Sequence, residues 1–270
     1  RWLTNVQVPK LNLKDFAPRL RKLNEAIQIE GMNLDWKVLE GFLVKLIPEG
    51  ESLEELDAQL AWGNQKVIVP RLRFNVYNGT VSGRAVLDHS GSVPVTAIEA
   101  ELERLSLARI VSGRQKQVVD GNLFAFVSLA GDGPFDSTWP DRLKGNGSLS
   151  ITNGEFHTID LLGSLGQIAE LSSLGHFGSG VTRFDDIRGD FQIENRKVAT
   201  DNLVLVSEDF RAEAAGDIDF EGSLNFRLSV YLAPNISRKI SSRLGENTRL
   251  GPIPLLVVGV IVAFVRINGA

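Results

Sequence analysis

The side chains in this chain that could do chemistry are three histidines and two pairs of acids. The histidines are scattered and lack the spacing of a metal-binding motif: His89, His157 and His176. We expect His157 and His176 to be exposed loop residues. The acid pairs are Asp185-Asp186 and Asp217/Asp219. A glycosidase would need two such carboxylates facing each other across a cleft, whereas strand periodicity puts the second pair on a solvated strand face, where acids keep a sheet soluble.

Other patterns offer little for catalysis or metal binding. The glycine-rich stretch from Gly175 to Gly180 follows an expected helix instead of opening one, and no Lys-Ser/Thr comes next, so it is not a phosphate-binding loop. Asp132 and Asp136 share one loop but have no EF-hand register. With no cysteine, the chain cannot form disulfides, thiol nucleophiles or Cys-based metal sites. We therefore expect no enzyme, no metal site and no cofactor.

Bulk composition narrows the class of protein further. The 270 residues carry a formal net charge of −4, which gives no electrostatic case for nucleic-acid binding. The chain begins at Arg1 without a methionine, so we expect a fragment or processed form whose N-terminal anchor would lie outside it. The longest apolar run, from Ile253 to Val265, is about a dozen residues, whereas a membrane-spanning helix needs about 20. We interpret that run as a buried strand pair or one long strand.

The clearest pattern of expected secondary structure runs from Leu143 to Ile193. Leu149 and Ile151 alternate with polar residues, which is the period of a half-buried strand. Asn153-Gly154 then predicts a hairpin turn, since both residues tolerate positive φ, and Phe156 restarts an apolar position beyond it.

An amphipathic helix is expected next, from Thr158 to Leu174. Asp160 suits its N-terminus, where an acid is favoured by the helix dipole. Apolar residues recur at spacings of three and four, chiefly Ile159, Leu162, Leu165 and Ile168. This helix would either pack as core at the end of a sheet or gate an entrance to it.

Strand alternation continues to the C-terminal part of the chain. Apolar residues of one parity run from Phe210 through a turn at Glu221-Gly222 to Leu232, and charged residues fill the other parity. Antiparallel sheets with one solvated face have this pattern. Turn signals recur at Asn78-Gly79, at Asn153-Gly154 and, without glycine, at Asn195-Arg196. The spacing fits a sandwich, a barrel or an elongated open sheet.

Three segments occur in a fixed order along the chain. The first is the hairpin-like stretch from Tyr77 to Gly83, within Leu72 to Leu87. The second runs from Leu143 to Leu162, with Leu149-x-Ile151-x-Asn153-Gly154 at its centre. The third is Thr182-x-Phe184-x-x-Ile187-x-Gly189-x-Phe191-x-Ile193, followed by Leu203 to Ser207 and by the strand that contains Gly216-x-Ile218-Asp219. Together they cover roughly Leu53 to Leu232, and their order and spacing resemble the AsmA family of bacterial envelope proteins, chiefly its C-terminal domain.

The resemblance implies a mainly β fold: an elongated, twisted antiparallel meander curled into an apolar groove, with a few short amphipathic helices packed on it or capping it. It also implies a periplasmic protein, anchored in the inner membrane by a missing N-terminal helix, that moves phospholipid between membranes or supports outer-membrane assembly. We expect an N-terminal segment at 1–52 that continues a larger missing region and an AsmA-like domain at 53–270. A possible internal boundary lies near 131–140.

A groove for acyl chains needs a continuous apolar face, because each buried methylene gains about 0.8 kcal/mol. The candidate groove residues are Leu149, Ile151, Phe156, Phe191, Ile193, Phe210, Ile218, Phe220, Leu224, Phe226, Leu228 and Val230. The same alternation fits an ordinary closed core. The leading hypothesis is a lipid-binding domain whose partner is phospholipid or another acyl-chain lipid, and the second is an assembly module that binds a client envelope protein. A hydrolase on a β scaffold is the third.

Overall fold

The computed structural model describes residues 2–12, 52–111, 119–134, 136–157, 180–243 and 252–260. The strands are β1 (Trp2–Asn12), β2 (Ser52–Gly63), β3 (Lys66–Val76), β4 (Gly79–Asp88), β5 (Val95–Ser106), β6 (Val119–Asp132), β7 (Leu143–Phe156), β8 (Thr182–Glu194), β9 (Lys197–Val206), β10 (Phe210–Asp219), β11 (Ser223–Leu232) and β12 (Ile253–Val260). The helices of the described ranges are α3 (Leu107–Val111), a 3₁₀ turn η1 (Trp139–Arg142) and α5 (Pro234–Arg243).

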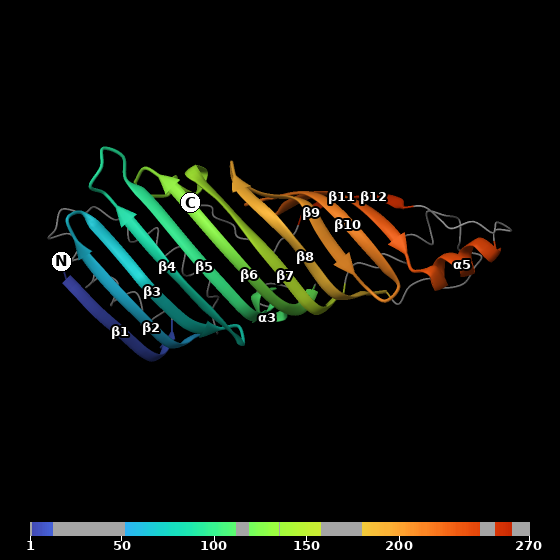
Figure 1. The fold of residues 1–270 in the computed structure, drawn as a ribbon, viewed down its shortest axis with the longest axis horizontal. Helices are drawn as coiled ribbons and strands as arrows, with labels where there is room; N and C mark the ends of the chain where they lie inside the picture. The colour runs from blue at the N-terminus through green and yellow to red at the C-terminus, as the bar shows by residue number, and fades with distance from the viewer. Residues whose placement is uncertain are drawn as a thin grey trace.

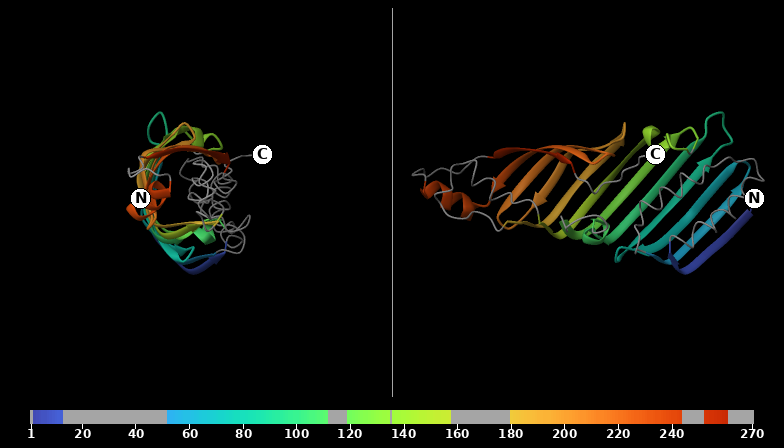
Figure 2. Two further views of the ribbon diagram at one scale, coloured as in Figure 1. Left: turned by 90° about the vertical axis from the view of Figure 1, so that its right-hand side faces the viewer. Right: turned by 180° about the vertical axis from the view of Figure 1, so that it is seen from behind.

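All twelve strands form one antiparallel sheet in strict sequence order, so each strand pairs with the next along the chain. Figure 1 shows this meander as a long ribbon from β1 to β12. Seen end-on in Figure 2, the sheet curves into an open arc instead of closing on itself. The expected elongated, curled meander with short helices is confirmed, and of the three architectures that fitted the spacing it is the open sheet.

The turn signals identified in the sequence differ in outcome. Asn195 and Arg196 have positive φ values of 54° and 59° and form the β8–β9 hairpin without any glycine. At the first signal the turn lies one residue earlier than expected: Tyr77 and Asn78 have φ values of 51° and 62°, and Gly79 already begins β4.

The hairpin predicted at Asn153-Gly154 is wrong, because both residues lie inside β7, which continues to Phe156. Asn153 has a φ of 53° and accompanies a register shift opposite Gly121, whose φ is 133°. An Asn-Gly pair supplies positive φ equally well for an irregularity within a strand. The helix expected after it, with Ile159, Leu162, Leu165 and Ile168, lies outside the described residues.

The loop near 131–140, the possible internal boundary, joins two strands that pair along their whole length. Gly131 at the end of β6 pairs with Leu143 at the start of β7. Trp139 in the loop is 2 % exposed and its indole packs over Gly131, where a Cβ would lie 2.7 Å from the Trp139 Nε1 atom. The sheet is therefore continuous past this loop.

Two groups of buried side chains form the core of the described part. One gathers residues of β1, β2 and the ends of β3 and β5, among them Val8, Leu56 and Leu105, with Ile110 of α3 packed against it. The other joins β8 to β11 around Phe184 and Val230. Leu105 of the first group and Ile187 of the second lie in one row of directly paired residues, so both groups lie on the same side of the sheet. Ile110 of α3 packs against the first group, and Figure 2 shows α3 on the inner side of the arc, which is therefore the side of the core.

Candidate functional site

The candidate site is the concave face of the sheet, which we call the apolar face. Strand pairing aligns its side chains into rows that run across the strands, since residues that pair directly in adjacent strands point to the same side. One unbroken row crosses β5 to β11: Leu105, Leu123, Ile151, Ile187, Leu205, Ala212 and Val230. A second crosses β3 to β11: Val69, Ala85, Ile98, Leu129, Gly145, Ile193, Val198, Ile218 and Leu224.

Neither row contains a charged or polar side chain. Adjacent strands lie about 4.8 Å apart, so the second row spans about 40 Å from β3 to β11. That length exceeds the roughly 30 Å thickness of a bilayer's hydrocarbon core. The residues of the second row are half-buried, so this row is a continuous apolar strip long enough to take an extended acyl chain, whereas most of the first row is buried core.

Glycines opposite aromatic rings shape this surface. Gly147 pairs with Phe191, and Gly216 pairs with Phe226. At both glycines an added Cβ would collide with the partner's ring, so each ring lies across its glycine. Large rings folded over residues without side chains cover the sheet with apolar surface while keeping its relief low.

The proposed groove residues occupy this face in most cases. On β7, the candidates Leu149 and Ile151 point to the apolar face. On β8, Phe191 and Ile193 point to the same face, each opposite a glycine of β7. On β10 and β11, Ile218 pairs with Leu224, and the remaining candidates alternate on the same side: Phe210, Phe226, Leu228 and Val230. Phe210 and Val230 are 3 % and 0 % exposed, so they are core, whereas Phe226 and Leu228 are half-buried.

Two candidates sit at the margins of the face. Phe156, the last residue of β7, packs on Phe184 with ring centroids 5.0 Å apart. Phe220 lies in the β10–β11 turn, where the Arg196 guanidinium is 5.8 Å from the centre of its ring.

The alternation missed several residues of the apolar face. Leu203 and Leu205 of β9 lie on the same side as Val198, although their parity differs, because the β9–β10 register shifts between them. The bulge falls at Asp201 and Asn202, polar residues that interrupt the apolar alternation of β9. This interruption was the feature of the sequence that could have predicted the bulge and the change of parity after it.

Among the residues of the described strands, the charged side chains lie at the rims and on the outer, convex face. Arg196 bridges three loops, with its guanidinium nitrogens 2.5 Å from Asp141 Oδ1 and 2.5 Å from Glu221 Oε1. Hydrogen bonding to Asp141 and then to Glu221 raises the pKa of Arg196. Lys197 and Asp217 form an outer-face ion pair at 2.9 Å, and this hydrogen bond raises the pKa of Lys197.

The acids and histidines considered for catalysis lie apart from the apolar face. Asp186 accepts a hydrogen bond of 3.0 Å from Ser150 Oγ on the outer face. Asp219 accepts the backbone N–H of Ser223 at 2.8 Å, which lowers the pKa of its carboxyl. His157 is half-buried, and its ring nitrogens lie 3.2 Å from Asp120 and 3.4 Å from Glu155. The expected loop position of His157 is confirmed, because it follows the last residue of β7, but the expected exposure is wrong, because the side chain is half-buried beside these two carboxylates. His176 lies outside the described residues.

The loop that contains the candidate calcium ligands Asp132 and Asp136 binds the guanidinium group of Arg142. Arg142 donates to the carbonyl oxygens of Asp132 and Pro134 at 2.6 Å each, and to Asp136 Oδ1 at 3.2 Å. Hydrogen bonding from the Thr138 hydroxyl lowers the pKa of Asp136. Within the described ranges, no group of three or more His, Asp or Glu side chains could hold a metal ion.

The sequence, compared with models of known families, matches the AsmA family model over residues 43–203, more than half of its length. The chain belongs to the AsmA family. The match spans β2 to β8 completely and most of β9. No curated protein and no solved structure matches the chain.

Membership of the AsmA family is consistent with an envelope-associated, lipid-related role. Among the described residues, no helix is both long and apolar enough to cross a membrane.

Proposed function

We propose that this AsmA-family protein binds phospholipid by its acyl chains on the apolar face and conducts it along the sheet between the inner and outer membranes. The observation that carries the proposal is the unbroken, uncharged row of half-buried residues across β3 to β11. In this account the protein is not an enzyme, acts in the periplasm and is tied to the inner membrane by an N-terminal anchor. Its transport of lipid supports assembly of the outer membrane.

The energetics of such a face suit acyl chains. A chain that buries about ten methylenes gains about 8 kcal/mol, which by itself corresponds to a dissociation constant near the micromolar range. No polar group is needed for that affinity, and none lies in the rows. A surface without specific polar contacts also lets a chain slide from one strand to the next, which conduction requires.

The open edges of the sheet favour a second function. Among the described strands, β1 and β12 lie at the edges of the sheet, and an edge presents backbone groups to which a partner strand can add. An assembly module that binds a client envelope protein would use such an edge. This alternative places the partner at β1 or β12 and leaves the apolar face filled by protein alone.

The test of lipid binding is a substitution on the apolar face with a matched control on the other face of the same strand. Phe226→Glu puts a carboxylate in the groove, while Asn225→Glu adds the same charge to an exposed position next to it. We expect binding of a fluorescent phospholipid to fall at least about tenfold for Phe226→Glu, a loss of about 1.4 kcal/mol or more, and to be unchanged for Asn225→Glu.

Leu228→Gln is a milder second variant, because it adds a neutral amide of similar size on the same face. Circular dichroism confirms that each variant is folded. Unchanged binding by folded Phe226→Glu and Leu228→Gln would contradict the proposal.

A further inference from the structure

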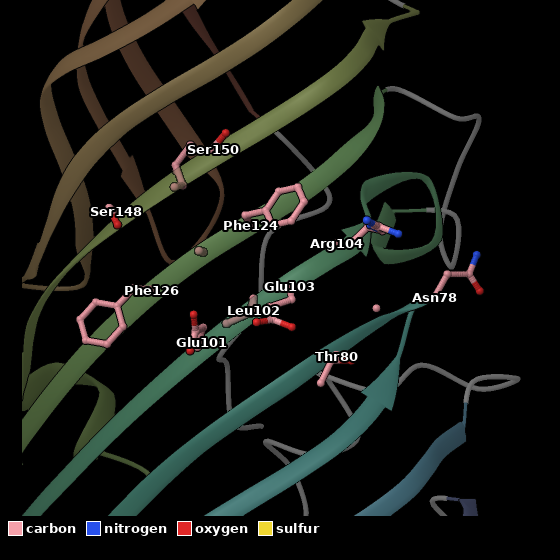
Figure 3. A pocket seen from close by; sticks show the side chains of 13 residues that line it. Asn78, Thr80, Glu101, Leu102, Glu103, Arg104, Phe124, Phe126, Ser148 and Ser150 are labelled. Atoms are coloured by element: carbon pink, nitrogen blue, oxygen red, sulfur yellow. The ribbon is translucent and has the colours of Figure 1, made fainter.

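The convex face carries an exposed phenylalanine that the lipid-binding face does not explain. Phe126 of β6 is 44 % exposed, and its neighbours in the row across the sheet are Glu101 on β5 and Ser148 on β7. Figure 3 shows Phe126 and Phe124 standing on β6 beside these polar side chains. Phe124, on the same face of β6, is half-buried, so the two rings form an apolar patch rimmed by polar side chains, which is the kind of surface that marks interaction sites.

Three shallow depressions meet at this ring. Their volumes are about 620, 500 and 580 Å³, and Phe126 lines all three. The small side chain of Ser148, which pairs directly with Phe126, leaves this space open. A partner can therefore reach the ring from both directions along the row.

The charges around two of these depressions are mostly negative. Glu101 and Glu103 are exposed, and neither forms an ion pair with any other described residue. Asp190 and Asp201 line the depression on the β7–β9 side. Arg104 is the single basic residue among the described linings of these two depressions.

The third depression has arginines, but two of them are neutralised within the sheet. Arg84 pairs with Glu99 at 2.7 Å, and Arg71 pairs with Asp57. Arg73 remains at the far end of the row, separated from Phe126 by Ser82 and Glu101. The unpaired charge next to the ring is therefore acidic.

We propose that this surface, formed by Phe124, Phe126, Glu101, Glu103 and Asp190, docks a segment of a partner protein that carries an apolar side chain flanked by Lys or Arg. The apolar side chain packs on the Phe126 ring, and the basic groups face the carboxylates. Charge complementarity selects a protein over a membrane, since anionic lipid headgroups attract basic surfaces and are repelled by carboxylates. The surface faces away from the apolar face, so partner docking is independent of lipid binding.

The experiment places the photo-crosslinking residue p-benzoylphenylalanine at position 126 in the full protein in cells, with Tyr231 as the matched control position. Tyr231 of β11 is 39 % exposed and, like Phe126, points to the convex face. We expect a protein adduct at 126 whose crosslinked peptide, sequenced by mass spectrometry, has Lys or Arg within three residues of the contact. Combined Glu101→Lys and Glu103→Lys substitutions should reduce the adduct about tenfold, because rim charges govern encounter of the partners.

Four results would overturn the proposal: adducts to lipid, a yield at 126 no greater than at 231, a peptide without basic residues, or a yield unaffected by the two charge reversals. None of them bears on acyl-chain binding by Phe226 and Leu228. The two proposals therefore fail separately.

Discussion

Phe191 lays its ring over Gly147, its direct partner across β7 and β8, and so forms part of the floor of the concave face. The same relationship joins Phe226 to Gly216 and Phe184 to Gly154, since a Cβ at either glycine would collide with the ring. These pairs cover the backbone with aromatic surface without building a wall across the sheet. Under the proposed function, this low relief lets an acyl chain lie across several strands.

Gly147→Ala should destabilise the protein by about 1–3 kcal/mol, because the new Cβ overpacks against the Phe191 ring and the backbone of Phe126. Denaturant unfolding measures the change. Gly91→Ala is the control, since its Cβ would make only ordinary contacts, the nearest at 3.5 Å. Equal effects of the two substitutions would show that the ring does not need a glycine beneath it.

Val230→Ala should lower the free energy of unfolding by about 2 kcal/mol and the melting temperature by several degrees, because a fully buried side chain leaves a cavity beside Ala212. Ser229→Ala, on the opposite face of the same strand, should change stability by less than about 0.5 kcal/mol. A small effect of Val230→Ala would mean that this part of the apolar face is open and not packed.

Arg196→Lys should cost about 1 kcal/mol, because an ammonium group cannot bond Asp141 and Glu221 with the planar fork of a guanidinium. Thermal unfolding of Arg196→Lys and Arg196→Ala checks this. We expect Arg196→Lys to be only slightly more stable than Arg196→Ala. Full recovery by Lys would show that charge alone, and not the fork, holds these three loops together.

Asp88→Asn should remove a pH-dependent part of the stability. Hydrogen bonds from Lys66 and then Ser90 lower the pKa of Asp88 from its ordinary 3.8 to about 2. A carboxyl with a depressed pKa stabilises the folded state fully above 3.8, and this contribution is lost as the pH falls towards 2. The urea midpoint of the wild type should therefore exceed that of Asp88→Asn at pH 5, and the gap should close between pH 4 and 2.

Lys66→Gln supplies the control for this pH dependence, because it removes the largest cause of the shift while leaving the carboxyl in place. Its stability should also lose sensitivity to acid between pH 4 and 2. A gap between wild type and Asp88→Asn that stays constant over this range would contradict the assignment.

The sheet and its two faces follow from the sequence because strand period and side-chain type agree along most of the chain. The apolar alternation from Phe210 to Leu232 matches the observed β10 and β11 almost residue for residue. The open meander could not be separated from a sandwich or barrel, since all three share a period of two. Which strands pair is a long-range property that alternation does not carry.

The predictions from the sequence that differ from the structure do so for local physical reasons. Asn153-Gly154 has the composition of a hairpin turn, but Gly154 is needed inside β7, where the Phe184 ring covers it. In β9, a bulge at Asp201 changes the parity of Leu203 and Leu205, so simple alternation assigns them to the wrong face. His157 resembles a loop residue in the sequence because Asp120, which lies against it, is 37 residues away.

The most direct test of the central claim is organic extraction of the purified protein, followed by mass spectrometry for lipid that has co-purified. Asn225→Glu and Phe226→Glu proteins, purified in parallel, serve as controls for lipid carried by the outer face and for loss of the groove. The account predicts near-stoichiometric phospholipid with wild type and Asn225→Glu, and strong depletion with folded Phe226→Glu. A lipid-free wild-type protein that melts cooperatively would contradict it and would make the apolar face a closed core.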